Sequence, residues 1–167
     1  MKNNDILRSV RYTFDFNDSK MIALFALAGH QVTRAQISDW LKKEDDPAFQ
    51  SCSDKLLTIF LDGLIIDRRG KQEGALPEPE QHLTNNVILK KLKIALNLQG
   101  DDILEIMALV RFSISRHEIS AFLRKPDNKH YRSCKDQVLR NFLKGLQRKY
   151  RSTQPDLATD DSLEGME

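Results

Sequence analysis

The stretch "SCSDKLLTIFLDGL" occupies residues 51–64, and a closely related stretch, "SCKDQVLRNFLKGL", occupies residues 133–146. When the chain is aligned with itself at an offset of 82, residues 3–66 match residues 85–148 at 20 of 64 positions without a gap. Identity at one fixed spacing over this length indicates an internal duplication. We therefore expect the two copies to fold alike.

Four segments of each copy have apolar residues at helical spacing, as in residues 3–14, 18–29, 33–41 and 51–66 of the first copy. The predicted fold is all-α, with two tandem repeats of about four helices each, packed as a pseudo-symmetric pair. The predicted organisation is helical repeat 1 in residues 1–66, a linker in 67–84, helical repeat 2 in 85–151 and a disordered acidic tail in 152–167.

Polar side chains mark the expected helix starts. Asn4 and Asp18 are predicted N-caps, and residues 33–36 and 115–118 have the hydroxyl and the Gln or Glu of a capping box. The repeated stretch places Ser51 and its equivalent at the start of the fourth helix of each copy. Glycine costs about 1 kcal/mol inside a helix. Its retention at positions 63 and 145 therefore predicts a close helix crossing or a helix end there.

Cys52 and Cys134 occupy the same position in the two copies, in the expected first helical turn. That position lowers a thiol pKa and favours reactivity, whereas free cysteines are usually small buried residues. We favour the buried interpretation. Two cysteines do not make a disulfide framework, and the four histidines lack zinc-site spacing, so we predict no metal and no cofactor.

The net charge of +2 conceals an uneven distribution. Residues 1–66 carry 8 basic and 9 acidic side chains, whereas residues 85–151 carry 15 basic and 6 acidic ones. A field of this sign attracts phosphate backbones. The candidate polyanion-binding residues are Lys125, Lys129, Arg132, Lys135, Arg140 and Lys144. Ordinary solvated helix faces also carry lysines, and that interpretation stays open.

Three further sets of equivalent residues have two interpretations each. Tyr131 is adjacent in sequence to these cations, and its ring could stack on a base. Alternatively, because Tyr131 aligns with Phe49, the ring is a core anchor in both copies. Arg34 and Arg116 follow a helix cap and could hold a phosphate, or could be solvated. Basic and acidic residues after the third helix could form a polar site between the copies, or an ordinary helix end: Lys43, Asp45, Lys125 and Asp127.

No phosphate-binding glycine loop, catalytic triad order or metalloprotease motif is present, so we expect no enzymatic activity. No apolar run approaches membrane-spanning length, and the first ten residues, "MKNNDILRSV", lack a signal-peptide apolar region. We therefore expect a cytoplasmic protein.

Several motifs resemble the YehS-like bacterial family, which is a tandem pair of a conserved domain of unknown function. They are "NNDILRSVRY", "WLKKED", "F-x-x-C-x-D-x-x-L-x-x-FL-x-GLI" with the following "RRGK", "NNVILKKLKIAL" and "C-x-D-Q-x-L-R-x-FL-x-GL". The resemblance extends from Asn3 to Tyr150. It implies a small, all-helical cytoplasmic protein and assigns no catalytic residues.

Two functions remain after these exclusions. The first is a non-enzymatic binding protein whose basic second repeat contacts nucleic acid or another polyanion. The alternative is a protein-interaction scaffold or homo-oligomer that uses the apolar surface between the repeats, where Ile65 and Ile66 replace two polar residues of the second copy.

Overall fold

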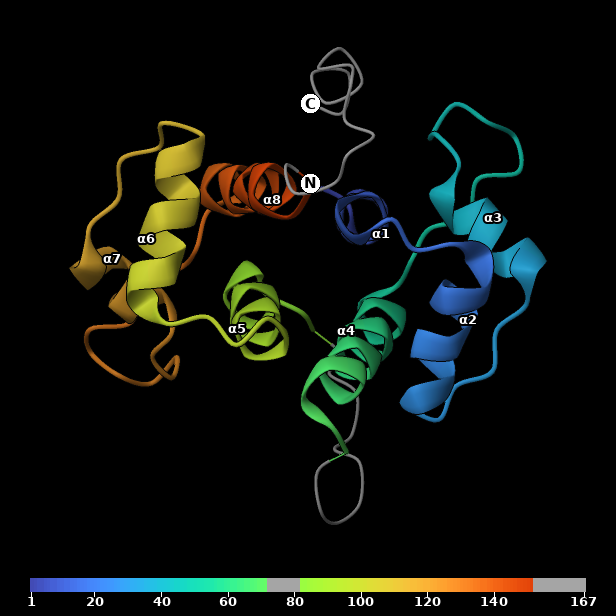
Figure 1. Cartoon of the computed structure of the whole chain (residues 1–167), viewed down its shortest axis with the longest axis horizontal. Coiled ribbons are helices and arrows are strands. Elements are labelled where there is room, and N and C mark those ends of the chain that lie inside the picture. The colour runs from blue at the N-terminus through green and yellow to red at the C-terminus, as the bar shows by residue number, and fades with distance from the viewer. Residues whose placement is uncertain (72–81, 152–167) are drawn as a thin grey trace.

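The computed structural model describes residues 1–71 and 82–151, and these residues form eight helices and no strand (Figure 1). Four helices belong to each copy, so the all-α prediction with paired repeats is confirmed. Copy 1 contains α1 (Asn3–Phe14), α2 (Asp18–Leu27), α3 (Arg34–Leu41) and α4 (Asp54–Arg69). Copy 2 contains α5 (Asn85–Ala95), α6 (Gly100–Leu109), α7 (Arg116–Phe122) and α8 (Asp136–Arg151).

The two copies join through two equivalent helix contacts. Helix α4 packs on α5, and α1 packs on α8. Because α1 and α5 are equivalent by the repeat, as are α4 and α8, these contacts are related by a pseudo-twofold axis. Figure 1 shows the four joining helices in the centre, with α2 and α3 outside them on one side and α6 and α7 on the other. The pseudo-symmetric pair is thus confirmed.

One apolar core runs through both copies. In α4, Leu57, Phe60, Leu61 and Leu64 are almost completely buried, as the spacing predicted. Their equivalents in α8 are buried as well, and all eight belong to one continuous cluster. Burial of such side chains is worth about 1.5–3 kcal/mol each. The core therefore holds the joining helices together as one unit.

The two retained glycines mark close helix crossings. A Cβ on Gly63 would lie 1.8 Å from the Leu24 carbonyl oxygen, and a Cβ on Gly145 would lie 2.5 Å from the Ile106 carbonyl oxygen. Real Cβ atoms do not approach so closely. Glycine is therefore needed where α4 crosses α2 and where α8 crosses α6.

The helix starts differ in part from the sequence prediction. The capping boxes at Thr33–Gln36 and Ser115–Glu118 form as predicted. The predicted N-caps at Asn4 and Asp18 are wrong, because Lys2 and Asn17 occupy those positions. Helix α4 is capped by Ser53, whose hydroxyl accepts from the Leu56 amide at 3.1 Å. Ser51 therefore lies outside the helix.

Helix α4 continues to Arg69, three residues beyond the predicted limit of repeat 1, and ends at Gly70 with φ +87°. The rest of the predicted linker and the predicted acidic tail include residues 72–81 and 152–167, which lie outside the described residues. Among the described residues, no helix combines the length and apolar character that crossing a bilayer requires.

Candidate polyanion-binding surface

Two buried asparagines fix the loop that precedes the last helix of each copy. The Asn4 side chain donates to the Trp40 carbonyl at 2.8 Å and to the Gln50 carbonyl at 2.9 Å, and it accepts from the Cys52 amide at 3.0 Å. Asn4 is 2% exposed, so these bonds are shielded from water. One side chain thus holds both ends of the α3–α4 loop against α1.

Copy 2 repeats this arrangement. Asn86 donates to the Phe122 carbonyl at 2.9 Å and the Arg132 carbonyl at 2.7 Å, and it accepts from the Cys134 amide at 2.9 Å. The preceding residue, Asn85, donates to the Asp136 carboxylate at 2.8 Å, as Asn3 does to its own partner in copy 1. We call each set of bonds an asparagine clamp. It accounts for the repeated "NN" and the repeated aspartate, and it binds the backbone of the repeated cysteine.

The repeated cysteines are buried and precede the helices rather than lying in their first turns. Burial, with the nearby Asp54 carboxylate acting in the same direction, raises the pKa of Cys52 to about 12. Burial and Asp136 likewise raise the pKa of Cys134 to about 11. A thiol with so high a pKa carries almost no thiolate at neutral pH. Both cysteines therefore serve packing and clamping, as the buried interpretation predicted.

The clamped loops have the same backbone in both copies. In the loop of residues 42–53, here called the copy-1 loop, the Phe49 amide donates to the Asp46 carbonyl at 3.0 Å. In the loop of residues 124–135, here called the basic loop, the Tyr131 amide donates to the Asn128 carbonyl at 3.0 Å. The Asp46 side chain also accepts a hydrogen bond from the amide two residues later at 2.9 Å, and the Asn128 side chain does the same at 2.8 Å.

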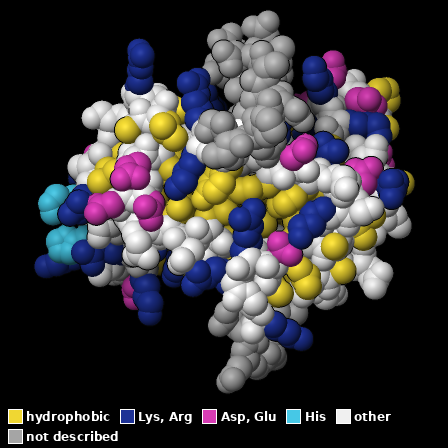
Figure 2. Space-filling model, in the orientation of Figure 1, with side chains coloured by type: hydrophobic (Ala, Val, Ile, Leu, Met, Phe, Trp, Pro, Cys, Tyr) yellow, Lys and Arg dark blue, Asp and Glu magenta, His cyan; other side chains and the backbone are white. Residues whose placement is uncertain are grey.

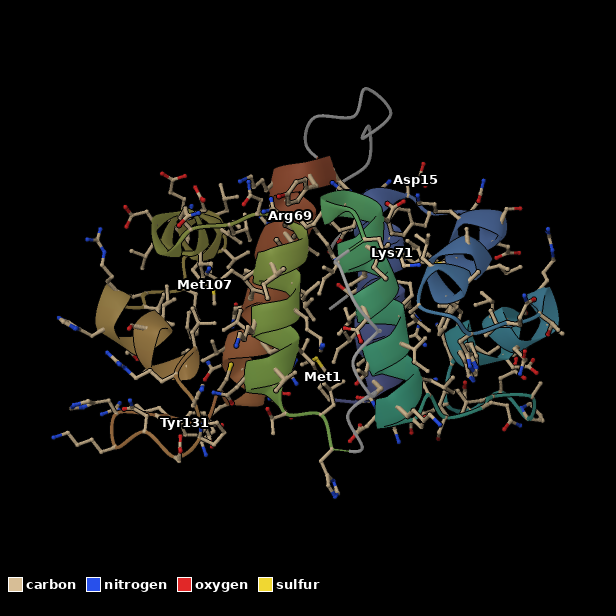
Figure 3. All side chains as sticks on the ribbon, turned by 90° about the horizontal axis from the view of Figure 1, so that it is seen from below. Met1, Asp15, Arg69, Lys71, Met107 and Tyr131 are labelled. Carbon is tan, nitrogen blue, oxygen red and sulfur yellow. The ribbon has the colours of Figure 1, made fainter. Side chains whose placement is uncertain are left out.

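The charges of the two loops differ. The copy-1 loop contains two lysines and three acidic residues, whereas the basic loop contains five Lys or Arg residues and one aspartate. All five cations of the basic loop are exposed. Figure 3 labels Tyr131 in this loop and shows nitrogen-tipped side chains that extend outward beside it. A rigid backbone therefore presents a concentrated positive charge to solvent.

The six predicted residues are divided between the basic loop and α8. Lys125, Lys129, Arg132 and Lys135 lie together on the basic loop. Arg140 and Lys144 lie on α8 and line a separate groove between α8 and α1. The repeat pattern could not separate the two groups, because their separation depends on how α8 packs against copy 1.

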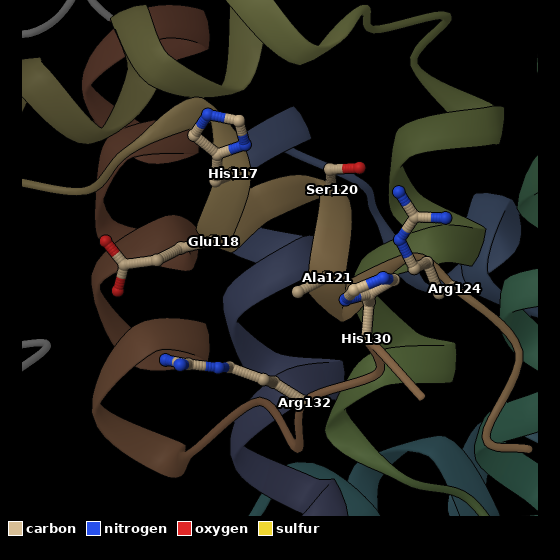
Figure 4. A pocket seen from close by; sticks show the side chains of 7 residues that line it. All are labelled: His117, Glu118, Ser120, Ala121, Arg124, His130 and Arg132. Atoms are coloured by element: carbon tan, nitrogen blue, oxygen red, sulfur yellow. The ribbon is translucent and has the colours of Figure 1, made fainter. Parts of the chain in front are cut away.

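A pocket of about 380 Å³ adjoins the basic loop on α7 (Figure 4). Arg124, His130 and Arg132 line it together with His117 and Glu118 of α7. Sequence reasoning did not assign Arg124 and His117 to the surface. Local spacing gives no signal for this pair, because His117 lies on α7 whereas Arg124 follows the end of that helix at Phe122. Figure 2 shows histidines among Lys and Arg at this outer edge of copy 2.

The remaining candidates have mainly structural surroundings. Arg34 and Arg116 are exposed and pair with Asp18 at 3.8 Å and Asp101 at 2.5 Å, which matches the solvated interpretation. Phe49 and Tyr131 are half-buried and lie outside the hydrophobic core, so their assignment as core anchors is wrong.

The polar residues after the third helix of each copy are separated by the fold. Lys43 lines the groove between the copies, whereas Lys125 lies on the basic loop. In the described ranges, no group of three or more His, Cys, Asp or Glu side chains is arranged to hold a metal ion.

The fold and surface define an all-α tandem-repeat protein with a clamped, basic loop in its second copy. The chain belongs to the family described as a protein of unknown function (DUF1456), which matches residues 3–70 and 85–152. It is 49% identical over 147 residues to the "Uncharacterized protein YehS" of Escherichia coli (strain K12), covering 87% of this chain and 94% of that protein. No solved structure matches the chain.

Proposed function

We propose that the protein is a non-enzymatic, cytoplasmic binding protein that contacts nucleic acid or another polyanion through the basic loop of copy 2. The observation that carries this proposal is the contrast between the two loops. Their backbones and clamps are equivalent, yet only the basic loop concentrates five exposed cations. Loop structure alone does not require this charge, because the copy-1 loop has the same turn without it.

The geometry favours a charged backbone as the ligand. A clamped loop loses little conformational freedom when it binds, so more of its electrostatic attraction appears as affinity. Phosphates that contact lysine and arginine release counterions, which makes such binding strongly dependent on salt. The half-buried ring of Tyr131 supplies a surface on which an unpaired base can stack. We therefore expect single-stranded nucleic acid to bind more tightly than duplex.

Fluorescence anisotropy of the full-length protein with labelled single-stranded RNA, duplex DNA and heparin tests this proposal. The probe variant is Lys129→Glu with Arg132→Glu, in the basic loop. The control variant is Lys55→Glu with Lys71→Glu, two exposed positions on α4 and just after its end. Both variants change the net charge by the same amount, so only the location of the lost charge differs.

We expect the probe variant to weaken binding by about tenfold or more at low salt and the control variant to change it by less than about twofold. Equal losses of affinity in both variants would show that binding depends on the net charge of the protein and not on the basic loop. Binding that is insensitive to salt, or absent for all three probes at low salt, would refute the proposal. Heparin binding equal to that of RNA would assign the site to polyanions in general.

A second candidate function is association through apolar surface. The surface between the copies, including the half-buried Ile65, packs within the chain itself. Two of the exposed apolar residues, Leu27 and Leu109, are 41% and 47% exposed at equivalent positions of the two copies. Sedimentation of the wild type and of Leu27→Ser with Leu109→Ser tests this alternative, which predicts an oligomer that dissociates in the variant.

A further inference from the structure

The duplication places two grooves at the junction of the copies, and the structure leaves one open and closes the other. The open groove lies between α1, α8 and the copy-1 loop and encloses about 450 Å³. Small-molecule sites in proteins typically have volumes of roughly 300–1,000 Å³. The pseudo-twofold axis relates this groove to the junction of α5, α4 and the basic loop.

An ion pair occupies the equivalent junction. Lys91 of α5 and Asp62 of α4 are 2.7 Å apart, and their side chains are only 15% and 16% exposed. Nearby Thr58 is 1% exposed. At the positions equivalent to Lys91, Asp62 and Thr58, the open groove has Ser9, Lys144 and Arg140.

These replacements open the groove and change its charge. Ser9 is too short to reach across, and its hydroxyl accepts a hydrogen bond from Gln147 at 3.2 Å, at the floor of the groove. Arg140 is exposed, whereas its equivalent is buried. At the closed junction, the Lys91–Asp62 ion pair occupies the space that the open groove leaves free for a ligand.

The walls of the open groove are mainly cationic. Five of its side chains are Lys or Arg and two are acidic, and the cations come from both copies: Lys2, Arg8, Lys43, Arg140 and Lys144. Arg8 is held in place, because its guanidinium donates to the Lys42 carbonyl at 2.9 Å. The side chains of Lys43 and Arg140 are exposed and make no hydrogen bond or salt bridge with another described residue, and Arg140 acts on the Asp136 carboxylate through longer-range electrostatics. These two are available for an anion.

An apolar wall stands beside these cations. The half-buried ring of Phe49 and the buried side chain of Leu143 line the same groove. A ring beside arginine and lysine suits a ligand with a planar body and a charged end. We propose that the open groove binds a nucleotide unit, with its phosphate on Lys43 and Arg140 and its base against Phe49. This site is distinct from the basic loop and does not rest on its function.

Isothermal titration of the full-length protein with adenosine monophosphate, inorganic phosphate and adenosine tests the site. We expect the nucleotide to bind at least about tenfold more tightly than either part alone, because both the cations and the ring contribute. A 5′-phosphorylated oligonucleotide and its 5′-hydroxyl form distinguish a free nucleotide from the end of a strand. Only a strand-end site prefers the phosphorylated oligonucleotide over the free nucleotide.

Two variants locate the binding. Ser9→Lys with Lys144→Asp reproduces the ion pair of the closed junction, and Arg140→Ala removes one cation from an exposed position, where folding is least affected. We expect each to weaken nucleotide binding by about tenfold or more. Binding of RNA by the basic loop should change by less than about twofold in Arg140→Ala. Nucleotide binding that survives both variants, or that never exceeds phosphate binding, would overturn the proposal.

Discussion

The copy-1 loop and the basic loop are built by the same hydrogen bonds and carry opposite charge. In each copy a buried asparagine ties both ends of the loop to the first helix, and the same turn shapes its middle. Between them, three acidic residues in one loop correspond to proline, aspartate and asparagine in the other. The fold therefore requires the clamp, which both copies have, but it does not determine the exposed charge of the loop.

The largest expected effect comes from the helix crossings shared by the two copies. Gly63→Ala should destabilise the protein by about 3 kcal/mol, because the added methyl group meets the backbone of α2. Gly145→Ala should cost less, since its contact is less severe. Urea unfolding measures both. Gly100→Ala is the control, because nothing beyond its chain neighbours and its own helix backbone lies within 4 Å of its Cβ position, and a destabilisation equal to that of Gly63→Ala would contradict the crossing.

Removal of the clamp should have the next largest effect. Asn4→Ala leaves two carbonyls and one amide without their partner, and we expect a loss of about 2 kcal/mol because the adjoining groove admits some water. Asn86→Ala should cost a similar amount in copy 2. Thermal unfolding of the two variants is the measurement. A neutral effect at either site would show that the clamps are not equivalent.

The loop charges should change binding without changing stability. Lys125→Glu with Lys135→Glu should weaken RNA binding by about tenfold, which corresponds to about 1.4 kcal/mol, because both side chains are exposed on the basic loop. Lys55→Glu with Lys71→Glu, two exposed positions outside the basic loop, is the comparison. Anisotropy at two salt concentrations measures both variants, and a larger loss from the comparison pair would contradict the assignment of the site to the basic loop.

The smallest expected effect concerns the buried thiols. Their folded pKa values, about 12 and about 11, lie above the ordinary value of 9.0, so the folded state retains protons that the unfolded state loses at alkaline pH. This contribution to stability is complete below pH 9 and declines as the pH rises toward 12. Comparison of urea unfolding at pH 7 and pH 10 should show a smaller decline in Cys52→Ala than in the wild type.

Thiol labelling provides an independent check on the same burial. At pH 8 both cysteines of the native protein should react with Ellman's reagent far more slowly than in urea, because both thiols are buried and burial raises the pKa of each. Rapid labelling of the native protein would contradict the clamped position of the two residues.

The repeat made the fold predictable from the sequence. The apolar spacing of two divergent copies predicts the same helices and the same buried faces. The starts of α1 and α2 were predicted wrongly. Asn4 has the side chain of an N-cap, but it bonds to carbonyls 36 and 46 residues away, and local propensity contains no information about such partners.

The surface was predictable only in part for a related reason. The charge count identified copy 2 as the basic half, and four of its six candidate residues do lie together on the basic loop. That Arg140 and Lys144 instead face copy 1 depends on the packing of α8 against α1. The ion pair that closes the equivalent junction joins α4 to α5, and neither residue has a sequence signature of that role.

The most direct test exchanges the loop charges while keeping the clamp. In one variant, residues 129, 130, 132 and 135 take the residues of copy 1, namely Lys129→Pro, His130→Ala, Arg132→Gln and Lys135→Ser. Each substitute already occupies the equivalent position of the same turn, so unfolding should be unchanged within about 1 kcal/mol. We expect anisotropy with labelled single-stranded RNA at low salt to show at least about tenfold weaker binding for this variant than for the wild type. A folded variant that binds RNA as tightly as the wild type would contradict this expectation.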